Sequence, residues 1–151
     1  MDGIRRDEFG LNRLQLRLPV WRNFVEVARD VVRKAFAKWL ENGLLSLDED
    51  LDVLRDSVLL VVSEMVTNAI KATEDTDGTV VILTLTINPA DVEVAVWDLA
   101  PGQPDLSREI SSEEESGRGL FLVRGLCRAI VVRTCEEGGG KEIACLVPRA
   151  A

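Results

Sequence analysis

A carboxylate and a carboxamide stand one helical turn apart in a strongly apolar part of the chain. Glu64 and Asn68 lie within residues 59–72, most of which are apolar. A spacing of four places both side chains on the same face of a helix. Burying them without partners is costly, so a polar ligand such as a hydrated metal ion is expected above them. The alternative is an amphipathic helix with two polar residues at its edge.

Glycines mark a second candidate site. Gly117, Arg118 and Gly119 open the apolar helical stretch 120–127, and the free N–H groups of such a helix start can approach an anion, most obviously phosphate. Residues 99–116 before it contain prolines, serines and acids without periodicity, which is typical of a lid or binding loop. A solvated linker is the alternative. Asp98 ends a predicted strand, where an aspartate is usually a turn or cap residue.

Composition limits the classes of function. The net charge of −8 argues against binding to a phosphate backbone, so nucleic acid is not an expected partner. No apolar run reaches the roughly 20 residues of a membrane span, and the N-terminus has no signal-peptide pattern. We therefore expect a cytoplasmic protein that does not bind a membrane. At 151 residues the chain fits one domain.

The residue types that are absent or rare exclude several kinds of catalytic and metal sites. The chain has no histidine, which excludes Ser-His-Asp and Cys-His catalysis, histidine-bound metals and a phosphohistidine within it. Its three cysteines are far apart without Cys-x-x-Cys spacing, so they predict small buried apolar residues rather than disulfides or zinc ligands. Carboxylates, amides, cations and backbone groups remain for any chemistry.

Hydrophobic periodicity predicts the elements that must position these groups. Alternation at period two predicts strands, and apolar residues at helical spacing predict helices. Ser46 or Asp48 is expected to cap the second helix. The expected order is a strand at 14–18, helices at about 20–40 and 51–72, strands at 79–87 and 92–97, and a final hairpin of 129–134 and 142–147.

The order of these features resembles the GHKL ATP-binding superfamily, or Bergerat fold. Ser-Glu-Met-Val-Thr-Asn-Ala at 63–69 and Glu-Ser-Gly-Arg-Gly-Leu-Phe-Leu-Val at 115–123 are similar, more narrowly, to bacterial anti-sigma factor serine/threonine kinases, particularly the actinobacterial regulatory ATP-binding proteins. The resemblance covers about 14–147. It implies an α/β fold of the α+β sandwich type over 1–151, with a mixed, mostly antiparallel sheet, helices on one face and an ATP lid at about 99–117.

The resemblance also implies roles for particular residues. Asn68 would hold Mg²⁺ between the nucleotide phosphates, and Glu64 would be the general base for an attacking serine hydroxyl or water. Asp98 would accept a hydrogen bond from the adenine amino group and so favour adenine over guanine. Together these groups would position ATP and neutralise its charge for phosphoryl transfer. The remaining residues expected to bind nucleotide are Lys71, Gly102, Gly117, Arg118, Gly119 and Leu120.

Several positions depart from the family pattern. Ala100 stands where the first glycine of the Asp-x-Gly-x-Gly motif belongs, which puts close approach of that backbone to the nucleotide in question. Ala72 replaces a frequent histidine, and Lys141-Glu142 stands where a threonine is common after the final glycine pair, so neither of those contacts carries over. The acidic run 113–115 precedes the phosphate-binding glycines, and we expect it to face outward on a solvated lid.

Three functions follow from the resemblance. The first is an anti-sigma regulator that binds Mg-ATP, captures a sigma factor and phosphorylates a serine of an anti-anti-sigma (STAS-type) partner. The second is a non-catalytic module that sequesters a partner with weak or lost nucleotide binding. The third, the ATP-binding half of a split histidine kinase, would need a phosphoacceptor histidine on another chain. A homodimer is implied as well, and Trp21, Phe24 and Trp39 could line its interface, although we expect these aromatics in the core.

Overall fold

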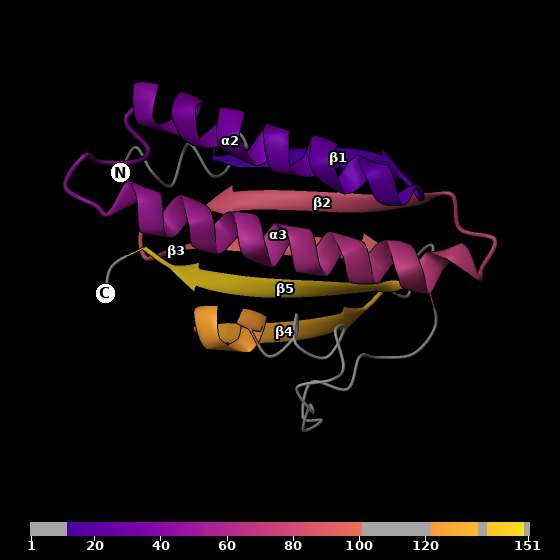
Figure 1. The fold of residues 1–151 in the computed structure, drawn as a ribbon. Coiled ribbons are helices and arrows are strands. Elements are labelled where there is room, and N and C mark those ends of the chain that lie inside the picture. The colour runs from indigo at the N-terminus through magenta and orange to yellow at the C-terminus, as the bar shows by residue number, and fades with distance from the viewer. Residues whose placement is uncertain (1–11, 101–121, 136–138, 150–151) are drawn as a thin grey trace.

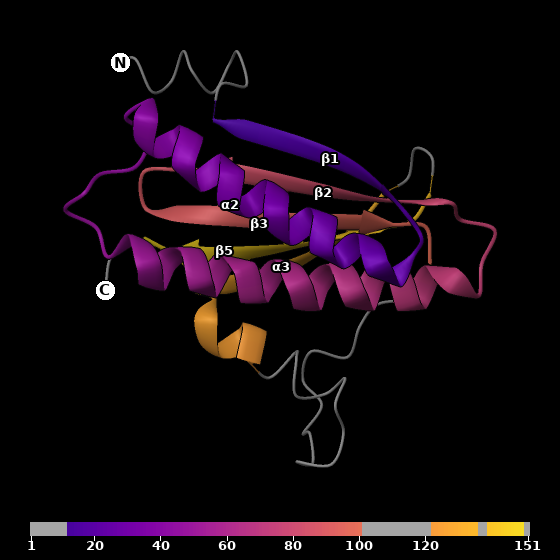
Figure 2. The same ribbon diagram turned by 45° about the horizontal axis from the view of Figure 1, so that its top comes forward.

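The computed structural model describes residues 12–100, 122–135 and 139–149. It contains one five-stranded sheet in the order β1-β2-β3-β5-β4, and every pairing between described strands is antiparallel. Two long helices lie side by side on one face of this sheet (Figures 1 and 2). The elements are β1 (Arg13–Pro19), the 3-10 helix η1 (Arg22–Phe24), α2 (Val25–Glu41), α3 (Leu51–Glu74), β2 (Val80–Ile87), β3 (Asp91–Asp98), β4 (Ala129–Thr134) and β5 (Lys141–Pro148).

The architecture confirms the predicted α+β sandwich with helices on one face of the sheet. All predicted strands and the helices predicted at about 20–40 and 51–72 are present, and the largest shift is at the start of α2, which begins at Val25. The helical stretch predicted at 120–127 contains a described short helix at 122–126. The sheet is more uniform than the expected mixed one, because all of its described pairings are antiparallel. No described helix is long and apolar enough to cross a membrane.

Strand alternation builds the core. On β3, Val92, Val94 and Val96 are buried, and period-two geometry turns all three toward the helices. The facing residues of β5 share this pattern, because Val94 pairs with Cys145 and Val96 with Ile143. α3 packs across these strands through a buried stripe of side chains that includes Val62, Val66 and Ile70. The stripe and the strands hold α3 in a fixed position over β3 and β5.

The start of α3 differs from the prediction. Neither Ser46 nor Asp48 caps the helix; instead the Asp50 carboxylate accepts a hydrogen bond from the Val53 backbone N–H at 3.3 Å. The Ser46 hydroxyl accepts a bond from Asp48 N–H within the preceding loop. Both predicted caps lie too early because the loop turns once more before the helix begins, and the acidic run 48–50 offered several equivalent candidates.

The aromatic residues of the N-terminal region divide between core and surface. Trp39 is buried and packs near Phe36, as expected for α2. Trp21 is 62% exposed, so the expectation of a core position is wrong for this residue. It precedes the short helix η1, and its ring meets Phe24 edge-on with centroids 5.6 Å apart. The helical pattern starting at Val20 did not reveal that α2 itself begins only at Val25.

Candidate functional site

Glu64 and Asn68 both lie in the middle of α3 and are half-buried. The structure therefore places the two residues on one helix at the spacing that the sequence predicted. Among the described residues, neither side chain takes part in a hydrogen bond or an ion pair. A carboxylate and an amide with that freedom can turn toward a ligand without first breaking a contact to this part of the chain.

The orientation of this pair follows from its neighbour Ser63. Ser63 faces α2, because Arg29 of α2 donates a hydrogen bond to its hydroxyl at 2.5 Å. Successive helical residues are rotated by about 100°, so Glu64 points about a quarter turn away from Ser63 and Asn68 about 40° further. Both lie on the flank of α3 that is turned away from α2. The short helix 122–126 lies on the same flank in both views (Figures 1 and 2).

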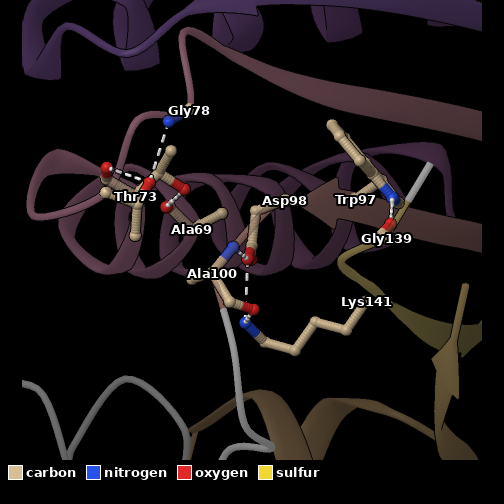
Figure 3. A network of polar contacts seen from close by, with 9 residues as sticks. Ala69, Thr73, Gly78, Trp97, Asp98, Ala100, Gly139 and Lys141 are labelled. Carbon is tan, nitrogen blue, oxygen red and sulfur yellow. Dashed lines mark hydrogen bonds and ion pairs between the residues drawn. The ribbon is translucent and has the colours of Figure 1, made fainter.

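Asp98 occupies the end of β3 and is 2% exposed. The alternation that buries Val94 and Val96 continues to this residue, so its carboxylate points to the helix-covered side of the sheet. Its Oδ1 atom accepts two hydrogen bonds, from Ala100 N–H at 2.9 Å and from Lys141 Nζ at 2.8 Å. Figure 3 shows the carboxylate between these two donors. Asp98 is thus a buried anion with a built-in counter-charge rather than a simple turn residue.

Lys141 was noted in the sequence only as a departure from the family pattern, and its pairing with Asp98 was missed. It begins β5 directly opposite Asp98, is 6% exposed, and donates a second hydrogen bond to the Ala100 carbonyl at 3.2 Å. The signal was present in the sequence, since the alternation of Ile143, Cys145 and Val147 continues back to Lys141. A lysine at the end of such a series is usually solvated, because a buried ammonium needs a paired anion. The pairing register of β3 with β5 places that anion, the Asp98 carboxylate, beside Lys141.

Glycines allow the backbone segments at the ends of α3, β3 and β5 to approach one another closely around Asp98. Gly140 has φ of +82°, and a Cβ at this position would lie 2.3 Å from the Asp98 carbonyl oxygen. The neighbouring Gly139 carbonyl accepts a bond from the Trp97 indole N–H at 3.2 Å. At Gly78, before β2, a Cβ would lie 2.6 Å from Thr73 Cγ2 and 3.4 Å from Leu99 Cβ. The end of α3 and the ends of β3 and β5 therefore converge here (Figure 3).

The other predicted nucleotide-binding residues are less constrained. Lys71 is exposed on α3. Val123, in the helix that follows the second glycine motif, is fully buried in the core and anchors that helix. Five of the predicted residues lie outside the described part of the chain: Gly102, Gly117, Arg118, Gly119 and Leu120.

The oxygen donors on α3 fit a magnesium ion that is bound jointly by the protein and the substrate phosphates. In the described part of the chain, no group of three or more aspartate, glutamate or cysteine side chains could enclose a metal ion. Mg²⁺ keeps several waters and is often held by one or two protein oxygens together with substrate phosphates. The amide of Asn68 and the carboxylate of Glu64, which have no hydrogen-bond partner among the described residues, suit that arrangement. They do not suit an ion held by the protein alone.

Comparison with known proteins agrees with this fold. Among solved structures, the chain is similar to the catalytic domain of the histidine kinase ThkA, with a TM-score of 0.51 and 19% identity over 91% of this chain and 98% of that one. At this identity the likeness establishes the fold alone. No curated protein matches the chain. Residues 25–145 match the family described as the histidine kinase-like ATPase domain. The chain therefore belongs to the histidine kinase-like ATPase domain family and is an ATP-binding, kinase-like domain of the GHKL type.

Proposed function

We propose that this protein is a cytoplasmic anti-sigma regulator that binds Mg-ATP and phosphorylates a serine or threonine of an anti-anti-sigma partner of the STAS type. The observation that carries the proposal is the pair formed by Glu64 and Asn68, which lie on one flank of α3 without a hydrogen bond or ion pair to another described residue. Family membership supplies the ATP-binding scaffold. The segments 63–69 and 115–123 support the narrower anti-sigma group through their resemblance to its members.

Each residue of the site has a chemical task in this proposal. Asn68 offers a neutral oxygen donor, and bound Mg²⁺ would supply positive charge to the nucleotide phosphates. The Glu64 carboxylate would accept the proton of the attacking hydroxyl as its oxygen approaches phosphorus. Asp98, held rigidly by Ala100 and Lys141, would contact the nucleobase. Phosphoryl transfer depends mainly on positioning and charge neutralisation, and these three tasks match those requirements.

Nucleotide binding is tested by calorimetric titration of the full chain with ATP in the presence and absence of Mg²⁺. We expect saturable binding that is stronger with Mg²⁺, and a loss of that enhancement in Asn68→Ala. The matched control is Asn23→Ala, which removes an exposed amide outside α3. Absence of ATP binding to the wild-type protein would refute the proposal.

The kinase step and the partners are tested together. The protein is incubated with radiolabelled ATP, Mg²⁺ and purified STAS-type proteins of the same organism, and sigma factors are assayed by co-purification. We expect label on one STAS protein and capture of one sigma factor. ATP binding with neither outcome across that set would contradict the regulatory role while leaving the ATP-binding domain intact.

A second candidate is a non-catalytic module that sequesters a partner and uses nucleotide weakly or not at all. The observation that favours it is the ion pair of Asp98 with Lys141, which engages the carboxylate proposed to contact adenine. Label transfer that Glu64→Ala abolishes would rule this candidate out. Sigma-factor capture that is unchanged by ATP and by Glu64→Ala would favour it over the kinase.

A further inference from the structure

We infer that Lys141 determines base selectivity in this site and reduces the discrimination between ATP and GTP that Asp98 alone would provide. The inference rests on the proposed nucleotide binding. It concerns which hydrogen-bond donors and acceptors the protein offers to the nucleobase. It arises from the contact of Lys141 Nζ with Asp98 Oδ1, 2.8 Å long and almost completely shielded from water.

A lone buried carboxylate discriminates strongly between purines. It can only accept hydrogen bonds, so it pairs with the amino group at position 6 of adenine and repels the carbonyl oxygen of guanine at the same position. When a buried polar group of the site has no partner on the wrong substrate, the correct substrate is preferred by a large factor. A site built around Asp98 by itself would therefore select ATP.

The ion pair has a different character. Lys141 is a donor beside the acceptor Asp98, and its positive charge offsets the negative charge that would repel the guanine carbonyl. The described contacts of Nζ use two of its three protons, for Asp98 Oδ1 and the Ala100 carbonyl, and both described contacts of Asp98 end on Oδ1. A donor and an acceptor side by side can meet either the amino group and ring nitrogen of adenine or the carbonyl and ring N–H of guanine.

The backbone at Ala100 reinforces this arrangement. Its N–H donates to Asp98 and its carbonyl accepts from Lys141, so this buried residue closes a small network around the pair. Ala100, which stands where the family pattern has a glycine, and Lys141, the first residue of the departing pair Lys141-Glu142, thus share one set of contacts. Register fixes the partners as well, because Asp98 and Lys141 are directly opposed on β3 and β5. Lys141 cannot leave the carboxylate without exposing a buried charge to an apolar surrounding.

The test compares the dissociation constants of ATP and GTP, both with Mg²⁺, for the wild-type full chain and for Lys141→Thr. We expect the two nucleotides to bind the wild-type protein within about threefold of each other, and the ratio to change by at least about tenfold in favour of ATP in the variant. The control is Lys34→Thr, which removes the same positive charge from an exposed position on α2 and should leave the ratio unchanged. Circular dichroism checks that each variant is folded.

Loss of Lys141 leaves Asp98 unpaired, so Lys141→Gln, which keeps a donor beside the carboxylate, is measured in parallel. We expect an intermediate ratio for it, and it carries the test alone if Lys141→Thr does not fold. Equal weakening of ATP and GTP, with the ratio unchanged in the folded variants, would show a merely structural lysine and overturn the inference while the proposed ATP binding stands. A wild-type ratio already above about thirtyfold would overturn it too. Failure of the wild-type protein to bind either nucleotide would refute the proposed function itself.

Discussion

Arg149 and Glu49, one hundred positions apart, form a two-bond ion pair with both N–O distances at 2.7 Å. Each side chain is only 15% exposed. The same guanidinium donates to the carbonyls of Asn88 and Leu44, and the Arg149 backbone N–H donates to the Ala90 carbonyl. This pair joins the end of β5 to the α2–α3 loop, at the end of the sheet opposite Asp98 (Figure 1). Stability and chemistry can therefore be perturbed separately.

Arg149→Ala should lower the free energy of unfolding by about 2–3 kcal/mol, because it leaves two carbonyls without a donor and the Glu49 carboxylate with only the Ser46 N–H and no counter-charge. Urea denaturation measures the loss. Arg133→Ala serves as the control, since Arg133 also pairs with acids but is 54% exposed, and should cost no more than about 1 kcal/mol. An equal effect of the two substitutions would contradict the assignment of Arg149 as a structural clamp.

Stability should depend on pH through Glu49. Hydrogen bonding from Arg149 holds the pKa of Glu49 below its ordinary value of 4.5. The unfolded chain therefore binds a proton more readily than the folded protein, and the contribution of the pair is present above about pH 4.5 and is lost as pH falls through the folded pKa. The unfolding free energies of wild type and Glu49→Gln should differ most above about pH 5 and converge in acid. A constant difference between wild type and Glu49→Gln across this pH range would contradict the prediction.

Gly140→Ala should be far more damaging than Gly43→Ala. Both glycines have positive φ, +82° and +77°, so both substitutions cost about 1–2 kcal/mol of backbone strain. At Gly43 a Cβ meets nothing within 4 Å, whereas at Gly140 it would collide with the Asp98 carbonyl. We expect about 3 kcal/mol more loss of stability at Gly140, measured by urea denaturation, together with weaker nucleotide binding. Similar losses for the two variants would show that the close approach to β3 is not rigid.

Glu64→Gln should separate binding from chemistry. The substitution keeps the size of the side chain and disturbs no described hydrogen bond, so ATP affinity should change by less than about threefold. Phosphoryl transfer to the partner should fall by roughly 10²–10⁴-fold, the usual contribution of a general base. The control is Glu26→Gln, an exposed carboxylate on α2. Transfer at the wild-type rate in Glu64→Gln would remove Glu64 from the role of base.

The local pattern of the sequence was enough for the elements and for part of the site. Alternation over β3 and helical spacing over α3 predicted both elements, because an element that buries one face repeats its apolar residues at its own structural period. The four-residue spacing of Glu64 and Asn68 placed them on one face for the same reason. It did not decide the cap of α3, where Asp50 competes with equivalent acidic and hydroxyl neighbours.

Tertiary structure alone decided what surrounds Asp98. Lys141 follows it by 43 positions, and only the register of β3 with β5 brings the two charges to 2.8 Å. Arg149 and Glu49 likewise meet only because the sheet returns β5 beside the α2–α3 loop. The sequence determined which residues face inward, since that depends on local period. It could not determine which inward charges become partners, because pairing depends on strand order and register, which are set by the packing of the whole core.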